Sequence, residues 1–129
     1  MDCFVYGTLT DPERATTVVP DAQFGPDACL KGLHRVEGQY PTLAPGGQTT
    51  GRILRTDAPA RLDEYEGVDR GLYTRVTAPG ETGDVTVYVG DPARLDAPVE
   101  WPGEGPFGCR VKQYVHEADV RVRVTPSSD

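Results

Sequence analysis

The sequence lacks any run of apolar residues long enough to cross a membrane as a helix. Such a span needs about 18 consecutive apolar residues, and no segment of the 129-residue chain approaches that length. The chain also does not open with a charged segment followed by an apolar one, so no secretory leader is expected. These absences predict a cytoplasmic protein without a membrane partner. The length predicts one domain over residues 1–129, with its own hydrophobic core.

Lysine is also scarce, and Lys31 and Lys112 are the two lysines among thirteen basic residues. Twenty acidic residues leave a net charge of -7. An acidic, lysine-poor surface suits a halophilic cytoplasm, where salt screens the repulsion between carboxylates, although an ordinary acidic protein is the alternative. Because nucleic acid attracts basic patches, this balance predicts no nucleic-acid partner.

Cysteine and histidine are too few and too scattered to form a metal centre. Cys3, Cys29 and Cys109 include no Cys-x-x-Cys pair, and His34 and His116 stand alone. We therefore expect no structural metal and three ordinary thiols in a reducing compartment. The spacing still allows a single disulfide bond or a reactive thiol.

Proline and glycine are abundant, with twelve and fifteen copies, which favours short strands joined by turns. Two short helices are expected, one from Asp11 to about Val19 and one starting near Asp57 and stopping before Gly67. A loop or bulged strand is expected at 39–47, and a loop-rich segment at 91–108. Strands are expected at residues 3–6, 28–36, 49–56, 73–77, 84–89, 111–115 and 120–124. The pattern as a whole predicts a strand-rich α+β domain.

The stretch Tyr6-Gly7-Thr8-Leu9 lies where the first strand ends and the helix start at Asp11 follows. A strand that ends in a glycine turn before a helix exposes several backbone N–H groups in one direction, and such a nest attracts an anion. Gly7 has no Cβ to block close approach. A plain strand-to-helix turn is the alternative interpretation of the same four residues.

Three acids follow one another closely at the end of the second expected helix. Asp63 and Glu64 fall off the face that carries Leu62 and Tyr65 toward the core, so both are expected in solvent. Glu66 lies in the last turn, where the helix dipole disfavours a carboxylate. With partial burial, its pKa would rise toward the range that suits a general base.

Two kinds of partner for Glu66 can be named from the sequence. Tyr73 on the next expected strand could donate a hydrogen bond to it. Alternatively, Glu66 is an exposed acid that pairs with Arg75 or Arg70, and its role is then structural.

Taken in order, three motifs of the sequence resemble those of the gamma-glutamylcyclotransferase-like superfamily. Within that superfamily, the small gamma-glutamylamine cyclotransferase-like domains are the most similar to this chain in length. The motifs are Tyr-Gly-Thr-Leu at 6–9, Leu-Asp-Glu-Tyr-Glu-Gly at 62–67 and Tyr-Thr-Arg-Val at 73–76. Further agreement comes from Tyr40-Pro41, from the strand around Gly51 and from Val-Tyr-Val at 87–89. The resemblance covers roughly residues 2–90 and extends more loosely to the tail.

This resemblance implies a small mixed β-barrel with short flanking helices and an active cavity at one mouth of the barrel. In the family, the backbone N–H groups of the turn matching Tyr6–Leu9 bind the glutamyl moiety of the substrate. A single glutamate serves as acid and base, and it matches Glu66. The family tyrosine that follows it matches Tyr73.

The reaction that the resemblance implies needs neither metal nor cofactor. Glu66 takes a proton from the α-ammonium of a γ-glutamyl amine, amino acid or peptide, and the freed amine attacks the γ-carbonyl. The products are 5-oxoproline and a free amine, and the turn stabilises the α-carboxylate or the developing oxyanion. The alternative is a non-catalytic domain that binds carboxylates or γ-glutamyl compounds. The expected partner is a small γ-glutamyl molecule, and no motif specifies an oligomeric state.

Overall fold

The computed structural model describes residues 2–37, 40–81 and 83–124. Within them, one sheet has the strand order β4-β5-β1-β3-β2-β6. Neighbouring strands are antiparallel except β1 and β5, which are parallel, so the sheet is mixed. The strands are β1 (Asp2–Val5), β2 (Gln23–Val36), β3 (Thr42–Arg55), β4 (Tyr73–Pro79), β5 (Asp84–Gly90) and β6 (Arg121–Val124).

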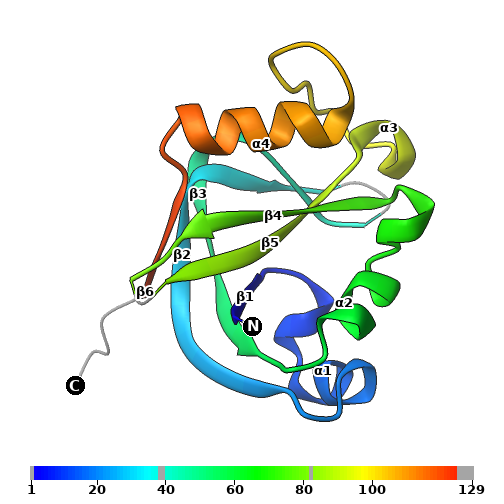
Figure 1. The fold of residues 1–129 in the computed structure, drawn as a ribbon, viewed down its shortest axis with the longest axis vertical. Coiled ribbons are helices and arrows are strands. Elements are labelled where there is room, and N and C mark those ends of the chain that lie inside the picture. Colours follow the sequence, from blue (N-terminus) through cyan, green and yellow to red (C-terminus); the bar gives the residue numbers. More distant parts are fainter. Residues whose placement is uncertain (1, 38–39, 82, 125–129) are drawn as a thin grey trace.

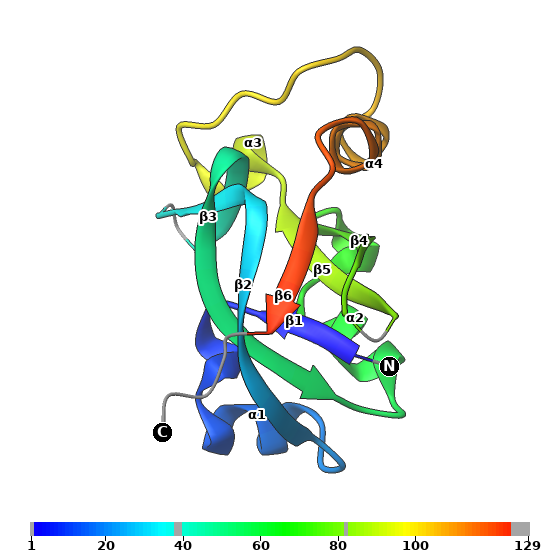
Figure 2. The same cartoon turned by 90° about the vertical axis from the view of Figure 1, so that its left-hand side faces the viewer.

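The sheet curls because its two longest strands, β2 and β3, bend along their fourteen residues each (Figures 1 and 2). Their register shifts between Lys31 and Leu33, where Gly32 adopts a φ of +98°. A Cβ on Gly32 would lie 2.9 Å from Val120, so glycine lets the chain before β6 pack closely there. The curl brings the two edges together, and Val124 of β6 donates its N–H to Glu81 beside β4 (3.2 Å). The fold is therefore the expected α+β class, with the sheet curled into a half-open barrel.

Helices lie outside the curled sheet at both ends of the molecule (Figure 1). Asp11 caps the first one as expected, since its side chain accepts a hydrogen bond from the N–H of Glu13 (3.1 Å). The helices in the described residues are α1 (Pro12–Val18), α2 (Pro59–Tyr65), α3 (Pro92–Leu95) and α4 (Phe107–Glu117), with 3₁₀ turns η1 (Thr8–Thr10) and η2 (Val68–Arg70). None of these helices is long and apolar enough to span a membrane.

The strand expected at 111–115 is wrong, as is the expectation of only two helices. Val111, Tyr114 and Val115 pack inward as one face of α4, which matches the i, i+3, i+4 spacing of a helix. Gln113, which a strand would turn to the same side as both valines, is exposed. The segment expected to be loop-rich, 91–108, likewise contains α3 and the first residues of α4.

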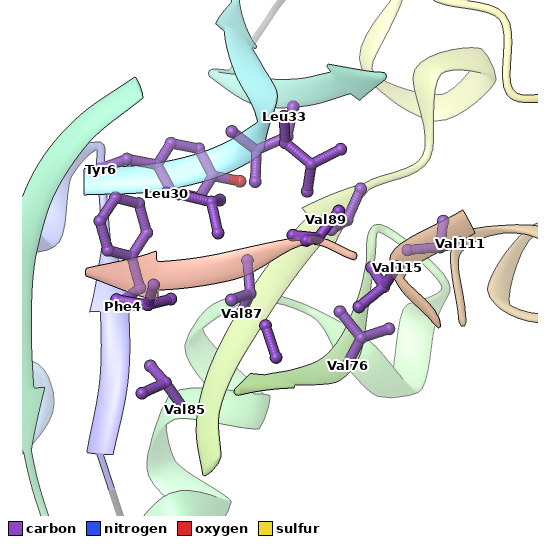
Figure 3. Close-up of a cluster of buried hydrophobic side chains, with 14 of the residues drawn as sticks. Phe4, Tyr6, Leu30, Leu33, Val76, Val85, Val87, Val89, Val111 and Val115 are labelled. Carbon is purple, nitrogen blue, oxygen red and sulfur yellow. The ribbon is translucent and has the colours of Figure 1, made fainter. Parts of the chain in front are cut away.

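Two hydrophobic clusters hold the fold together, and β1 contributes to both because its side chains alternate between faces. Phe4 enters the larger cluster inside the curl, which extends to the valines of α4 at its other side (Figure 3). Cys3 and Val5 enter the smaller cluster with α1 and α2. The smaller cluster also contains Leu62, so α2 is anchored to the back of the same strand that leads into the Tyr6–Leu9 turn.

Candidate functional site

A cavity of about 390 Å³ lies between the end of β1, helices α1 and α2, and the start of β4. This volume falls within the ~300–1,000 Å³ that is usual for small-molecule sites. Its deepest walls are the buried side chains of Phe4, Val5, Tyr6, Leu9 and Tyr88. Exposed side chains stand at its mouth, and the most exposed large aromatic among them is Tyr40 (54%).

The turn that follows β1 forms one wall of this cavity through Tyr6, Gly7 and Leu9. The N–H and the hydroxyl of Thr10 both donate to the carbonyl of Gly7 (3.1 and 2.7 Å), which holds the turn closed. Among the described residues, neither the N–H of Gly7 nor that of Leu9 donates to a protein acceptor. The side chain of Thr8, also predicted at the site, lies outside the part that the structure describes.

Arg35 on β2 fixes the orientation of the peptide bond that enters the turn. Its Nη1 donates to the carbonyl of Tyr6 at 2.9 Å, and its Nε is held by Glu37 at 2.9 Å. The carbonyl and the N–H of a trans peptide point in opposite directions, so the N–H of Gly7 is directed away from Arg35. Gly7 belongs to the cavity wall and Arg35 does not. Nothing in the local sequence marks Arg35, because it lies 29 residues from its partner.

Glu66 forms the C-terminal cap of α2, and its side chain lines the cavity together with the turn. Gly67 then adopts a left-handed conformation (φ 69°), as expected just past a helix end, and a Cβ there would lie 2.8 Å from Leu72. In the described part of the chain, no hydrogen bond or ion pair reaches the Glu66 carboxylate. Burial of this group raises its pKa from 4.5 to about 7. Of the two causes expected, partial burial and the helix dipole, desolvation accounts for the shift.

Asp63, one turn earlier on α2, has the opposite environment. Its carboxylate accepts the hydroxyl of Tyr88 at 2.6 Å and pairs with Arg75 at 3.0 Å. The expectation that Asp63 is solvated is therefore wrong, whereas Glu64 is exposed as expected. The alternative pairing of Arg75 with Glu66 is also wrong, because Asp63 occupies Arg75.

Tyr6, Tyr73 and Tyr88 line the same cavity as Glu66, and their hydroxyls bond to other groups. Tyr73 lines the cavity as predicted, but its hydroxyl donates to the carbonyl of Pro41 (2.6 Å), so the expected bond to Glu66 is not formed. Tyr6 donates to the carbonyl of Tyr88 at 2.6 Å. Burial raises the pKa of all three hydroxyls well above the usual range, and the nearby Glu66 charge adds to this for Tyr6 and Tyr73. They are neutral donors that stiffen the cavity.

Tyr88 is a cavity residue that the sequence did not assign to the site. Its position in the Val-Tyr-Val strand matched the family pattern, and a polar aromatic flanked by two valines was the available signal. Its role depends on the pairing of β5 with β1 and on the reach to Asp63, neither of which is local. Within the described residues, no group of three or more His, Cys, Asp or Glu side chains gathers as metal ligands.

Residues 3–104 match a family described as "Gamma-glutamyl cyclotransferase, AIG2-like". AIG2-like protein C from Arabidopsis thaliana is 32% identical over 99 residues, which are 68% of this chain and 58% of that protein. The chain thus spans little more than half the length of this relative.

Solved structures resemble the whole fold. An AIG2-like protein from Mus musculus superposes with a TM-score of 0.57 at 25% identity, over 99% of this chain and 97% of that one. A structure described as gamma-glutamyl cyclotransferase superposes with a TM-score of 0.60 at 22% identity, over 70% of this chain and 66% of the other. The second likeness shows a shared fold.

Proposed function

Because the chain belongs to the gamma-glutamyl cyclotransferase, AIG2-like family, we propose that it closes γ-glutamyl compounds to 5-oxoproline and releases the amine. The observation that carries this proposal is the placement of Glu66. Glu66 is partly buried, has no hydrogen-bond or ion-pair partner in the described part of the chain and has a pKa of about 7. It lines the same small cavity as a backbone turn in which, among the residues that the structure describes, two N–H groups have no acceptor. A site that only bound carboxylates would gain nothing from a second acid facing its ligand.

Proton transfer is the task that this environment suits. A group whose pKa lies near the working pH is deprotonated often enough to accept a proton and holds it weakly enough to return it. Glu66 removes one proton from the α-ammonium group of the substrate, which turns the nitrogen into a nucleophile. The new bond joins this nitrogen to the γ-carbon, and a five-membered ring forms.

The second half of the reaction breaks the bond between the γ-carbon and the leaving nitrogen. Glu66 gives its proton to the leaving nitrogen as that bond breaks. The second proton lost by the attacking nitrogen ends on the product amine, which departs as an ammonium ion. The N–H groups of Gly7 and Leu9 hold the α-carboxylate or the oxyanion of the intermediate, and the folded chain gives the reacting groups a high effective concentration.

The test is the production of 5-oxoproline from γ-glutamyl compounds by the wild type and by Glu66→Gln. Glutamine keeps the size and polarity of the side chain but accepts no proton, so we expect turnover to fall by ~100- to 10,000-fold. Glu64→Gln makes the same chemical change at an exposed position of the same helix and should leave turnover unchanged. Asp63→Asn is an unsuitable control, because the Asp63 carboxylate accepts the hydroxyl of Tyr88 in the cavity wall.

Two outcomes would contradict the proposal. Turnover that survives in Glu66→Gln would remove Glu66 as the acid and base. A wild-type protein that binds γ-glutamyl compounds but forms no 5-oxoproline would be the non-catalytic binding domain.

A further inference from the structure

The charged residues around the cavity are distributed by depth. Among the described lining residues three are charged, namely Glu66 in the interior and Arg14 and Arg70 at the exposed mouth. Even with Glu66 ionised, the lining carries one net positive charge, in a chain whose net charge is -7. A positive mouth on an acidic protein attracts an anionic group.

The two arginines come from different elements that meet only in the folded chain. Arg14 lies on α1, and Arg70 closes η2 just after the Gly67 turn. Within the described residues, neither guanidinium has a hydrogen bond or an ion pair. Arg35 and Arg75, which lie nearby in the fold, are instead held by Glu37 and Asp63.

The proposed chemistry leaves one part of the substrate facing this mouth. The γ-glutamyl unit has its α-carboxylate or oxyanion at the turn and its ammonium at Glu66, so its reacting carbon lies inside. The leaving amine therefore extends toward Arg14, Arg70 and the exposed ring of Tyr40. A guanidinium binds a carboxylate through two parallel hydrogen bonds, whereas a simple alkylamine offers it nothing.

We propose that Arg14 and Arg70 bind a carboxylate on the leaving group, so that γ-glutamyl amino acids or peptides are better substrates than γ-glutamyl alkylamines. This inference rests on the proposed function. Tyr40 provides an apolar face for the side chain of the amino acid that departs. The arginines are specificity residues, since they touch the part of the substrate that does not react.

A matched pair of substrates tests this assignment. γ-Glutamyl-alanine and γ-glutamyl-ethylamine differ only in the carboxylate of the leaving group, and both carry the same α-carboxylate and α-ammonium. We would measure kcat/KM for 5-oxoproline release with the wild type, Arg14→Gln, Arg70→Gln and the double variant. Arg61→Gln is the control, because Arg61 is exposed on α2 and does not line the cavity.

The wild type should prefer γ-glutamyl-alanine. Each single variant should lose about 5-fold on that substrate and the double variant about 20-fold, as expected for two exposed and partly independent ion pairs. All variants should stay within about 2-fold of the wild type on γ-glutamyl-ethylamine. The preference should also shrink as salt is added, because exposed charges are screened.

An equal loss on both substrates would overturn the inference, since the arginines would then bind the glutamyl unit that both compounds share. Unchanged kcat/KM on γ-glutamyl-alanine in the double variant would overturn it as well.

If the wild type releases 5-oxoproline from neither compound, the proposed function fails, and calorimetric titration still decides the role of the arginines. The carboxylate-binding role of the arginines is supported if the wild type binds γ-glutamyl-alanine more tightly than γ-glutamyl-ethylamine and the double variant does not. Equal affinity of the wild type for the two compounds rejects this role.

Discussion

The two ends of the curled sheet use aromatic side chains in different ways. Beneath α4, Trp101 packs edge-to-face against Phe107 and Tyr114, with ring centroids 6.0 and 5.5 Å away. Around the cavity, Tyr73 and Tyr88 instead donate their hydroxyls to a carbonyl and a carboxylate on other elements. At the α4 end the aromatic rings fill the core, whereas at the other end the tyrosines fix the walls of the cavity.

The difference shows where stability is gained and where it is given up. Apolar burial at the α4 end is favourable at every pH. At the cavity end, the partly buried Glu66 has no hydrogen-bond or ion-pair partner among the described residues, and its charged form is disfavoured by desolvation. The protein keeps an unfavourable group where chemistry would need one, as strained or poorly compensated groups are often found at functional sites.

The largest expected effect comes from weakening the α4 end. Leu33 is fully buried in the large cluster, next to Gly32, whose carbonyl accepts the hydroxyl of Tyr114 on α4 (2.9 Å). Leu33→Ala should lower the free energy of unfolding by ~2–5 kcal/mol, through lost transfer energy and the void left behind. Urea denaturation measures this loss, and turnover per folded molecule should stay constant. A decrease in the free energy of unfolding below about 1 kcal/mol would mean that packing at the α4 end contributes little to the stability of the fold.

Replacing Glu66 at the cavity end should instead raise the free energy of unfolding. The folded-state pKa of Glu66 is raised to about 7 from 4.5, so the folded protein binds a proton that the unfolded chain has released between these values. Stability contributed by the neutral acid is therefore present below pH ~4.5 and is lost as pH rises through ~7. Glu66→Gln should be more stable than the wild type by ~1–3 kcal/mol at pH 8, a range discounted for partial exposure, and nearly equal at pH 4.

Denaturation of both proteins across this pH range measures the effect. A Glu66→Gln protein that is less stable than the wild type at pH 8 would show that the ionised carboxylate has a stabilising partner. Glu64→Gln, changed at the exposed neighbour, should show no such pH dependence.

Arg35 should affect turnover without lining the cavity, because it holds the Tyr6 carbonyl in place. Arg35→Met removes the hydrogen bond to the Tyr6 carbonyl and lets the Gly7 peptide rotate. We therefore expect kcat to fall about 10-fold, with a smaller change in KM. This fall in kcat is smaller than the one caused by complete loss of an oxyanion donor. Arg35→Lys should restore part of the rate, since an ammonium can still donate to the carbonyl. Arg55→Met is the control, because Arg55 is also exposed and ion-paired but lies away from the cavity. An equal drop in both Met variants would point to a general loss of stability instead.

Salt should have the smallest effect and act on the whole surface. With a net charge of -7, the acidic side chains repel one another in the folded state. Screening shortens the range of this repulsion from about 10 Å in 0.1 M salt to about 3 Å in 1 M salt. We expect the free energy of unfolding to rise by up to about 1 kcal/mol over this interval. Thermal melts at increasing salt measure it. A flat or falling melting temperature would contradict the interpretation of the acidic surface as an adaptation to salt.

Local signals in the sequence predicted the cavity end better than the α4 end. The Asp11 cap, the Gly67 stop and the resulting place of Glu66 all depend on neighbouring residues, and the structure has them as expected. The partners of Asp63 could not be predicted, because Tyr88 and Arg75 lie 25 and 12 residues away.

The α4 end was mistaken for a strand because β-branched valines dominate it. Val111 and Val115 have high strand propensity, but packing of their shared helical face against the sheet outweighs that preference. Curling of the sheet into a half-open barrel also depends on long-range pairing, and it was expected only through the resemblance to a known family.

The most direct test of the account is the titration of Glu66 itself. The carbon-13 shift of its side-chain carboxyl, assigned by comparison with Glu66→Gln, would be followed by nuclear magnetic resonance from pH 3 to 9. We expect an apparent pKa of about 7, because the carboxylate is desolvated and has no partner in the described part of the chain. A midpoint near the ordinary value of 4.5 would contradict it, since Glu66 would then be solvated or paired and poorly suited to carry a proton between the two nitrogens.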